Sequence, residues 1–209
     1  MAWWGVDDCG RGPPARLKGL LVMSRIRYAP LAILFLSICC GSQDVLEDPQ
    51  GNVYKTTVIG DQEWMIENLL FDVGQGTYCY QDDPDLCIEM GRLYTWAAAK
   101  EATDQIRGWH LPTRQEWEEL ISYCGGDSAG YGKIVSDTVR FNPQWSGVRI
   151  STGVYKAGEL KGVNYWSSTT ADTNSTYAYS VAILSKLRII SPHNYPKENA
   201  CSVRLIRDR

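Results

Sequence analysis

The chain has 209 residues, with 24 Asp and Glu against 21 Lys and Arg, and a formal net charge of −3 at pH 7. From Cys40 onward there are 22 acidic and 16 basic residues, a net charge of −6, and no block of basic residues occurs. A surface that follows nucleic-acid phosphates is therefore not expected. The length fits one domain with shorter flanking segments.

Residues 23–38 have the layout of a secretory signal peptide. Arg25 and Arg27 form a positive head, and the apolar run from Leu31 to Ile38 is too short to span a bilayer. A short buried core helix is the alternative interpretation of the same residues. The flanking sequence favours export.

The ending "LSICC" resembles a bacterial lipobox, in which a cysteine is lipidated and becomes the new N-terminus. Cys39 is the expected lipidation site. Cys40 remains the alternative, because Ile38 is larger than the residue usually found before the cut. Residues 39–50 are polar and predict a tether between the lipid and a folded domain.

Residues 1–22 precede a complete signal peptide, which an exported chain does not need. Lys18-Gly19 requires the codons AAR-GGN, a purine-rich stretch like a ribosome-binding site, three codons ahead of Met23. The hypothesis is that translation starts at Met23 and that residues 1–22 are an untranslated leader.

A β-hairpin is the first element predicted after residue 50. "VYKTTVIGDQEWMIENL" alternates along two stretches, and Gly60-Asp61 supplies the turn. "CYQDDPDLC" then predicts an acidic turn between Cys79 and Cys87. "LYTWAAAKEA" predicts a helix because it contains strong helix formers. The residues at helical spacing are Leu93, Trp96, Ala97 and Lys100.

"GWHLPTRQEWEEL" predicts the start of a second helix. Thr113 and Glu116 fit a capping box, in which each side chain bonds a backbone N–H of the first turn. Gly125-Gly126 should end the helix. The predicted buried stripe is Trp117, Leu120, Ile121 and Cys124. His110 is expected to bond backbone groups before this helix. Acid–base catalysis is the alternative, and no companion motif supports it.

Residues 125–165 are rich in Gly, Ser and Asn and predict long loops, whereas the C-terminal part predicts strands. The strand segments are "NYWSST", "TYAYSVAIL", "LRIIS" and "CSVRLIR". Three tyrosines of the loops could stack on sugars, bind a protein or complete the core: Tyr131, Tyr155 and Tyr165.

The loop that holds Asp82, Asp83 and Asp85 is a candidate metal site, because calcium prefers several hard oxygen ligands. The loop lacks the Gly and the terminal Glu of an EF-hand, and Pro84 fits a tight turn. A solvated acidic turn is therefore the favoured interpretation. No metal, cofactor or catalytic residue is predicted.

Six motifs occur in a fixed order: "GNVYKTTVIGDQEWMIENL", "CYQDDPDLC", "GRLYTWAAA", "GWHLPTRQEWEEL", "YWSST" and "SVRLIRD". Together they resemble the Fibrobacter succinogenes major paralogous domain, a family of exported, often lipid-anchored bacterial modules. The resemblance implies an α+β, C-type-lectin-like domain over residues 51–209. In that fold, two helices pack on a small twisted antiparallel sheet with long loops. Its relatives include formylglycine-generating enzymes, but the resemblance implies no settled activity.

The resemblance also bears on the cysteines. Many members carry a cysteine just before the Gly-Trp-His segment and another in the last strand, where this chain has residues such as Thr103 and Leu205. Cys124 and Cys201 are expected to replace that pair. Because export predicts an oxidising compartment, the expected disulfides are Cys79–Cys87 and Cys124–Cys201.

The combined expectation is an exported, lipid-anchored, non-enzymatic module of the bacterial cell envelope, at the outer membrane or the cell surface. Its expected partners are the membrane, through the lipid anchor, and a glycan or envelope protein at its loops. One alternative is an enzyme related to the formylglycine-generating branch, which a reactive free thiol would favour. The other is a purely structural envelope or adhesion component.

Overall fold

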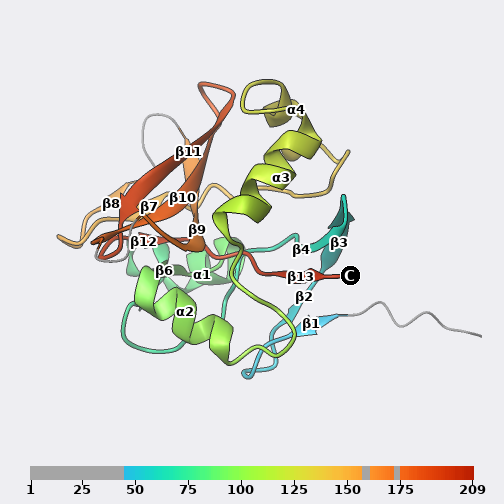
Figure 1. The fold of residues 1–209 in the computed structure, drawn as a ribbon. Helices are drawn as coiled ribbons and strands as arrows, with labels where there is room; N and C mark the ends of the chain where they lie inside the picture. Colours follow the sequence, from blue (N-terminus) through green and yellow to red (C-terminus); the bar gives the residue numbers. More distant parts are fainter. Residues whose placement is uncertain (1–44, 157–160, 172–174) are drawn as a thin grey trace, which may run out of the picture. The chain divides into compact units, whose positions relative to one another are not determined.

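The computed structural model describes residues 45–156, 161–171 and 175–209, which form an α+β fold (Figure 1). The helices of this part are η1 (Tyr80–Asp82, a 3₁₀ helix), α1 (Pro84–Met90), α2 (Trp96–Asp104), α3 (Arg114–Cys124) and α4 (Ala129–Val135). The strands are β1 (Leu46–Glu47), β2 (Val53–Tyr54), β3 (Thr56–Ile59), β4 (Gln62–Met65), β5 (Thr77–Tyr78), β6 (Leu93–Thr95), β7 (Val148–Arg149), β8 (Tyr155–Lys156), β9 (Gly162–Thr170), β10 (Tyr177–Leu184), β11 (Ile189–Pro196), β12 (Ala200–Cys201) and β13 (Ile206–Asp208).

A three-stranded antiparallel sheet with the order β11-β10-β9 has helices packed against both faces. Side chains alternate between the two faces of a strand. Tyr165 of β9 and Val181 of β10 accordingly belong to a core cluster with α3, whereas Trp166 belongs to a second cluster with α2. Since both faces are covered, β10 is apolar along most of its length.

The predicted hairpin is confirmed, and the C-terminal part contains strands as predicted, but the segment "CSVRLIR" is divided between β12 and β13. β3 and β4 pair across the two-residue loop Gly60-Asp61, where Gly60 has φ +63°. β13 pairs with β4, so the end of the described chain lies beside the hairpin in the sheet β13-β4-β3 (Figure 1). β12 instead joins a five-stranded sheet with the order β5-β6-β12-β7-β8.

Helix α3 follows the sequence pattern. The capping box between Thr113 and Glu116 is present, and Gly125 ends the helix in the left-handed conformation with φ +106°. The predicted stripe is buried: Trp117, Leu120, Ile121 and Cys124. This helix is therefore held by one apolar face and by caps at both ends.

Helix α2 starts later than the sequence suggested. Leu93 and Tyr94 lie in β6, because pairing with β5 and β12 holds these residues extended. The helix begins after Thr95, whose side chain accepts a hydrogen bond from the Ala98 N–H at 3.3 Å. The buried face is Ala98, Ala99, Ala102 and Thr103, whereas Ala97 and Lys100, which were singled out for their helical spacing, are exposed.

Two predicted loops contain regular structure. Between Cys79 and Cys87 the chain forms η1 and the start of α1, with Pro84 at the first helical position and the Asp83 carboxylate capping it. Residues 125–165 contain α4, β7, β8 and the beginning of β9. These helices and strands are short, so their hydrophobic periodicity covers too few residues to be recognised in the sequence.

The fold begins before residue 51. β1 pairs with β2, and Leu46 and Asp48 are only 3% and 4% exposed. The hydroxyl of Tyr54 donates a 2.5 Å hydrogen bond to the Asp48 carboxylate, which supplies the partner that a buried charge needs. Residues 45–50, predicted as part of a polar tether, thus belong to the folded part.

One of the two expected disulfides is confirmed, and the other is wrong. Cys79 and Cys87 are bonded, with an S–S distance of 2.10 Å. Cys124 and Cys201 are free and buried. They cannot pair because Cys124 lies in the core cluster with α3 and Cys201 lies in the cluster with α2, on the other side of β9.

Several predictions concern residues outside the described part of the chain. These are the leader at 1–22, the signal peptide at 23–38, and the lipidation site at Cys39 or Cys40. Within the described residues, no helix has the length and apolar character that crossing a bilayer requires.

Candidate functional site

Aromatic, basic and acidic side chains from three segments meet at the surface beside the disulfide. We call them the Tyr155 cluster: Tyr78, Tyr80, Asp82, Arg149 and Tyr155. The Tyr155 hydroxyl donates to Asp82 Oδ1 at 2.5 Å, and the rings of Tyr80 and Tyr155 meet edge to face at 5.4 Å. Asp82 is exposed, and the other four residues are partly exposed. The cluster thus presents ring surface and polar groups together.

Arg149 joins the two sides of this cluster. Its guanidinium lies 3.9 Å from the ring centre of Tyr78 and 5.7 Å from that of Tyr155. β5 and β7 are separated by β6 and β12, so their backbones lie roughly 14 Å apart at the usual strand spacing. The long side chains bridge this distance, and cation–π attraction favours the contact. The Nε of Arg149 is buried and has no hydrogen-bond partner among the described residues.

A tight hairpin places Tyr155 against Arg149. Gly153 closes the turn between β7 and β8 with φ +90°, and its N–H bonds the carbonyl of Ile150 at 2.8 Å. A Cβ at Gly153 would lie 3.4 Å from the Arg149 guanidinium and would strain the backbone. Glycine is therefore favoured at this position.

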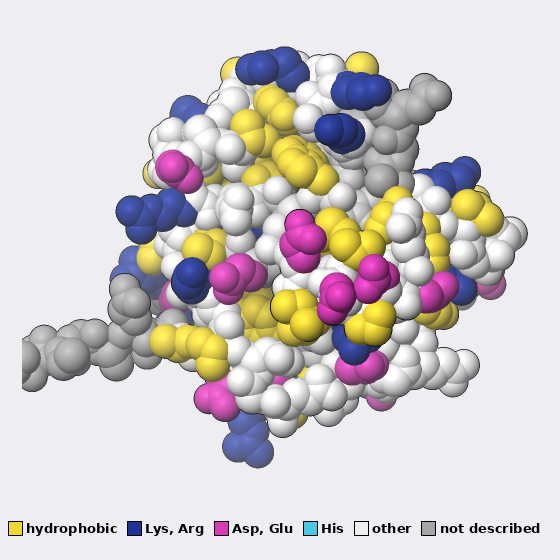
Figure 2. Space-filling view, turned by 180° about the vertical axis from the view of Figure 1, so that it is seen from behind, with side chains coloured by type: hydrophobic (Ala, Val, Ile, Leu, Met, Phe, Trp, Pro, Cys, Tyr) yellow, Lys and Arg dark blue, Asp and Glu magenta, His cyan; other side chains and the backbone are white. Residues whose placement is uncertain are grey.

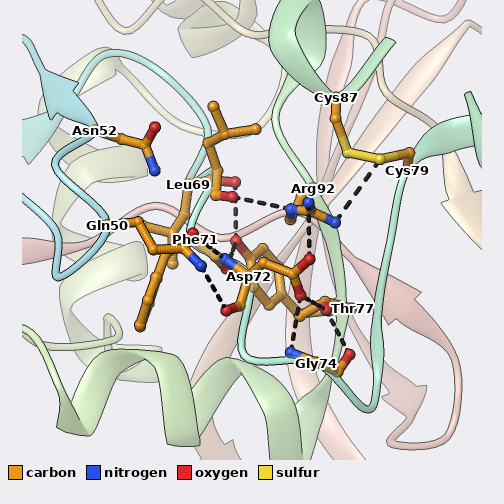
Figure 3. A network of polar contacts seen from close by, with 12 residues as sticks. Gln50, Asn52, Leu69, Phe71, Asp72, Gly74, Thr77, Cys79, Cys87 and Arg92 are labelled. Atoms are coloured by element: carbon orange, nitrogen blue, oxygen red, sulfur yellow. Dashed lines mark hydrogen bonds and ion pairs between the residues drawn. A yellow bond between two sulfur atoms is a disulfide. The ribbon is translucent and has the colours of Figure 1, made fainter. Parts of the chain in front are cut away.

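A polar network centred on Arg92 fixes the segment that carries Tyr78 and Tyr80 (Figure 3). The guanidinium of Arg92 lies 2.9 Å from the Asp72 carboxylate and donates to the Leu70 carbonyl at 3.0 Å. It also contacts the disulfide sulfur of Cys79 at 3.8 Å. Figure 3 shows Arg92 between the disulfide and the Asp72 loop, which ties both to one side chain.

The Asp72 carboxylate holds the turn before β5. Its Oδ1 accepts from the Gly74 N–H at 2.8 Å and from the Thr77 hydroxyl at 2.6 Å. Burial alone raises the pKa of Asp72, but these two hydrogen bonds and the charge of Arg92 outweigh it, so the pKa is lowered. Asp72 is therefore ionised at neutral pH and fixes the start of β5 next to Tyr78.

The three aspartates that were considered as calcium ligands, Asp82, Asp83 and Asp85, do not act together. Asp83 caps α1 by accepting from the Asp85 N–H at 2.9 Å, and Asp82 accepts the hydroxyl of Tyr155. Burial and the bond to Asp82 raise the pKa of Tyr155 to about 12. Within the described residues, these three carboxylates do not form a group close enough to share one ion.

Of the three loop tyrosines proposed for recognition, only Tyr155 has ring surface available. Tyr131 and Tyr165 are 6% and 0% exposed. Tyr165 stacks on Trp117 with 5.7 Å between ring centres. Both residues complete the core beneath α3 and α4, which is one of the alternatives that the sequence left open for them.

His110 has a side-chain partner that the sequence did not reveal. Its backbone exchanges two hydrogen bonds with Ile206, as the expectation of backbone bonding requires. Its Nε2, however, lies 2.8 Å from the Glu116 carboxylate. This hydrogen bond raises the pKa of His110 despite partial burial, and Asp208 adds to the effect. Glu116 therefore takes part in the capping box and also contacts the imidazole of His110.

The two free thiols of the described residues, Cys124 and Cys201, are poor nucleophiles. Burial raises the pKa of Cys124 and of Cys201. A thiol must be exposed and ionised to react readily. Neither residue offers the reactive thiol that the enzyme alternative would need.

Figure 2 shows most Lys and Arg side chains of this face toward its edge and a few among the acidic side chains. Acidic side chains lie nearer its middle, and hydrophobic side chains reach the surface in several places. Nucleic-acid binding requires a continuous basic surface. This face does not provide one.

Helices packed on small antiparallel sheets, with loops that carry a polar and aromatic cluster, define a non-repetitive α+β domain. The sequence model of the Fibrobacter succinogenes major domain (Fib_succ_major) matches residues 58–207. The chain belongs to this family, as its six motifs indicated. Comparison with curated proteins gives no match.

Most of the Tyr155 cluster was missed from the sequence. Tyr78 and Tyr80 flank Cys79, and this position beside a disulfide is the signal that could have indicated them. Arg149 lies about 70 residues away, beyond the reach of a local pattern. Only the folded chain shows that "TYCY" and "VRISTGVYK" share a surface.

Proposed function

We propose that this protein is an exported, lipid-anchored, non-enzymatic module of the bacterial cell envelope that binds a glycan through the Tyr155 cluster. The observation that carries the proposal is the partly exposed group of three tyrosine rings, one guanidinium and one carboxylate. Binding sites commonly combine apolar and aromatic surface with a few placed polar groups. Tyr and Arg are also the residues enriched where binding energy concentrates.

The chemistry of the cluster suits a sugar ring. A tyrosine ring offers a rigid apolar face at a low conformational cost. Arg149 carries a planar fork of donors, and Asp82 is an acceptor for hydroxyl groups. The Arg92 network and the disulfide hold the segment of Tyr78 and Tyr80 before a ligand arrives, which reduces the entropic cost of binding.

A C-type-lectin-like arrangement is the fold relationship that we propose for the domain, with its ligand at the loops. The buried, weakly acidic thiols of Cys124 and Cys201 support a binding module over an enzyme of the formylglycine-generating type. The signal-like segment and the "LSICC" sequence support export and a lipid anchor at Cys39 or Cys40.

The test is a binding screen of the purified protein against bacterial envelope glycans, both neutral and acidic. Tyr155→Ala is compared with Tyr123→Ala, because Tyr123 is 57% exposed on α3 and lies outside the cluster. We expect the Tyr155 variant to weaken binding about tenfold or more, as for a central aromatic residue, and the Tyr123 variant to bind normally. Equal binding by both variants would place the ligand elsewhere. Binding of an envelope protein without any glycan would replace the glycan proposal.

A further inference from the structure

His110, Glu116 and Asp208 bring three possible metal ligands together. One ligand atom from each, the imidazole nitrogen and two carboxylate oxygens, lies within 4.8 Å of the others. The residues come from the segment before α3, from its first turn and from β13. His110 and Glu116 are partly exposed and Asp208 is exposed, so an ion from solvent can reach them.

The backbone holds two of these side chains in position. His110 is fixed by hydrogen bonds in both directions with Ile206, at 2.8 and 3.0 Å. Ile206 and Asp208 belong to β13, where Asp208 pairs with Gln62 of β4. The strand that orients His110 therefore also carries Asp208.

The capping box orients Glu116. Its Oε2 accepts from the Thr113 N–H at 2.6 Å and from the Thr113 hydroxyl at 2.8 Å. Its Oε1 points to His110 Nε2. A carboxylate whose second oxygen is hydrogen-bonded is the usual arrangement around a metal, because the outer contacts fix the ligand.

The neighbouring cations bind other carboxylates. Arg207, next to Asp208 in β13, donates to Glu63 at 2.7 Å. Arg114, at the start of α3, donates to Glu118 at 2.7 Å. The carboxylates of Glu116 and Asp208 place negative charge beside His110. This negative charge would attract a metal cation.

We propose that His110, Glu116 and Asp208 form a binding site for a divalent transition-metal ion, with Zn²⁺ as the best fit. One imidazole and two carboxylates are ligands that Zn²⁺ accepts, whereas Ca²⁺ and Mg²⁺ prefer oxygen alone. Two ligands of a tetrahedral Zn²⁺ lie about 3.3 Å apart. The 2.8 Å contact between His110 and Glu116 needs only a small opening, in which the ion replaces the shared proton.

The exposed Asp208 completes the set by turning its side chain inward. Three protein ligands leave a fourth position for water. The ion would connect the start of α3 to β13, two segments about 90 residues apart in sequence. This inference does not depend on the glycan proposal, because its residues lie outside the Tyr155 cluster.

The experiment is calorimetric titration of the purified protein, free of any affinity tag and treated with EDTA and then dialysed, with ZnCl₂ at neutral pH. The variants are His110→Gln and Asp208→Asn. The control is His193→Gln, because the His193 ring bonds the Ser191 carbonyl at 2.9 Å and lies beside Ser180. Circular dichroism establishes that each variant is folded. Asp208 is exposed, so its substitution keeps the test valid if His110→Gln does not fold.

We expect one Zn²⁺ per chain, bound about tenfold or more weakly by His110→Gln and by Asp208→Asn and normally by His193→Gln. CaCl₂ should give no comparable binding. The proposal is overturned if the protein takes up no Zn²⁺ at about 0.1 mM free ion, or if both site variants bind it as the wild type does. Either result would leave His110 and Glu116 as an ion pair at the helix start.

Discussion

Replacement of Trp117 by Ala tests how the core beneath α3 is built. The side chain is fully buried, and its ring lies 4.9 Å from Trp64 and 5.7 Å from Tyr165. Its Nε1–H donates to the Trp166 carbonyl at 3.3 Å. Truncation of a buried Trp costs about 3–5 kcal/mol, because both transfer free energy and packing are lost. Since a domain is stable by about 5–15 kcal/mol, this single change should remove a large share of the free energy of unfolding.

Trp117→Phe is the graded variant for this position. It keeps an aromatic ring against Trp64 but removes the indole N–H, so a loss of about 1–3 kcal/mol is expected. Unfolding by urea is followed by far-UV circular dichroism for both variants. Tryptophan fluorescence is not suitable, because the substitutions remove one of the fluorescent residues. Tyr123→Ala is the matched control, since Tyr123 is exposed on the same helix. A Trp117→Ala protein with an unfolding midpoint like that of the control would refute the proposed packing of α3.

Three further predictions concern the cap, the Asp72 network and the anchor. Thr113→Ala should lower the free energy of unfolding by about 1 kcal/mol in urea titration, because the helix loses its N-cap. Asp72→Asn should destabilise the protein at neutral pH. The pKa of Asp72 is lowered from its ordinary value of 3.8, so the difference in the free energy of unfolding between wild type and variant should shrink as the pH falls through that lowered pKa. A difference in the free energy of unfolding that stays constant between pH 7 and pH 2 would contradict the ionised role of Asp72. Simultaneous replacement of Cys39 and Cys40 by Ala should move the protein from the membrane to the soluble fraction after cell fractionation, because buried acyl chains hold a lipoprotein; unchanged membrane residence would exclude the anchor.

The sequence predicted those elements whose stabilising contacts are made between residues close together in the chain. The capping box needs only Thr113 and Glu116, three residues apart, and the hairpin needs only the Gly60-Asp61 turn between two alternating stretches. The start of α2 failed for the opposite reason. Residues 93–95 have helix-compatible composition, but pairing with β5 and β12 holds them extended. Tertiary contacts overrode a weak local preference.

The candidate sites are formed by contacts between segments that are distant in sequence. The sequence does not show which of these segments come into contact. Cys124 and Cys201 looked like a pair, yet they lie in separate core clusters. Tyr155 and Tyr165 looked alike as loop tyrosines, but only Tyr155 reaches the surface. Asp208 lies near His110 because His110 pairs with Ile206 of β13, the strand that also contains Asp208. The sequence around either residue does not indicate this pairing. Sequence periodicity predicts which face of an element is apolar, but not which elements meet.

The most direct test of the central claim is to map the glycan site on the protein itself. The tightest-binding glycan from the screen is titrated into isotopically labelled protein, and the amide chemical shifts are followed by NMR. The largest shifts should occur at the Tyr155 cluster and its hairpin, at Tyr78, Tyr80, Arg149, Gly153 and Tyr155. Shifts confined to the hollow of about 560 Å³ lined by Arg114, Glu118 and Tyr179 would contradict the account, because that surface lies over α3 and β10 and includes no residue of the cluster.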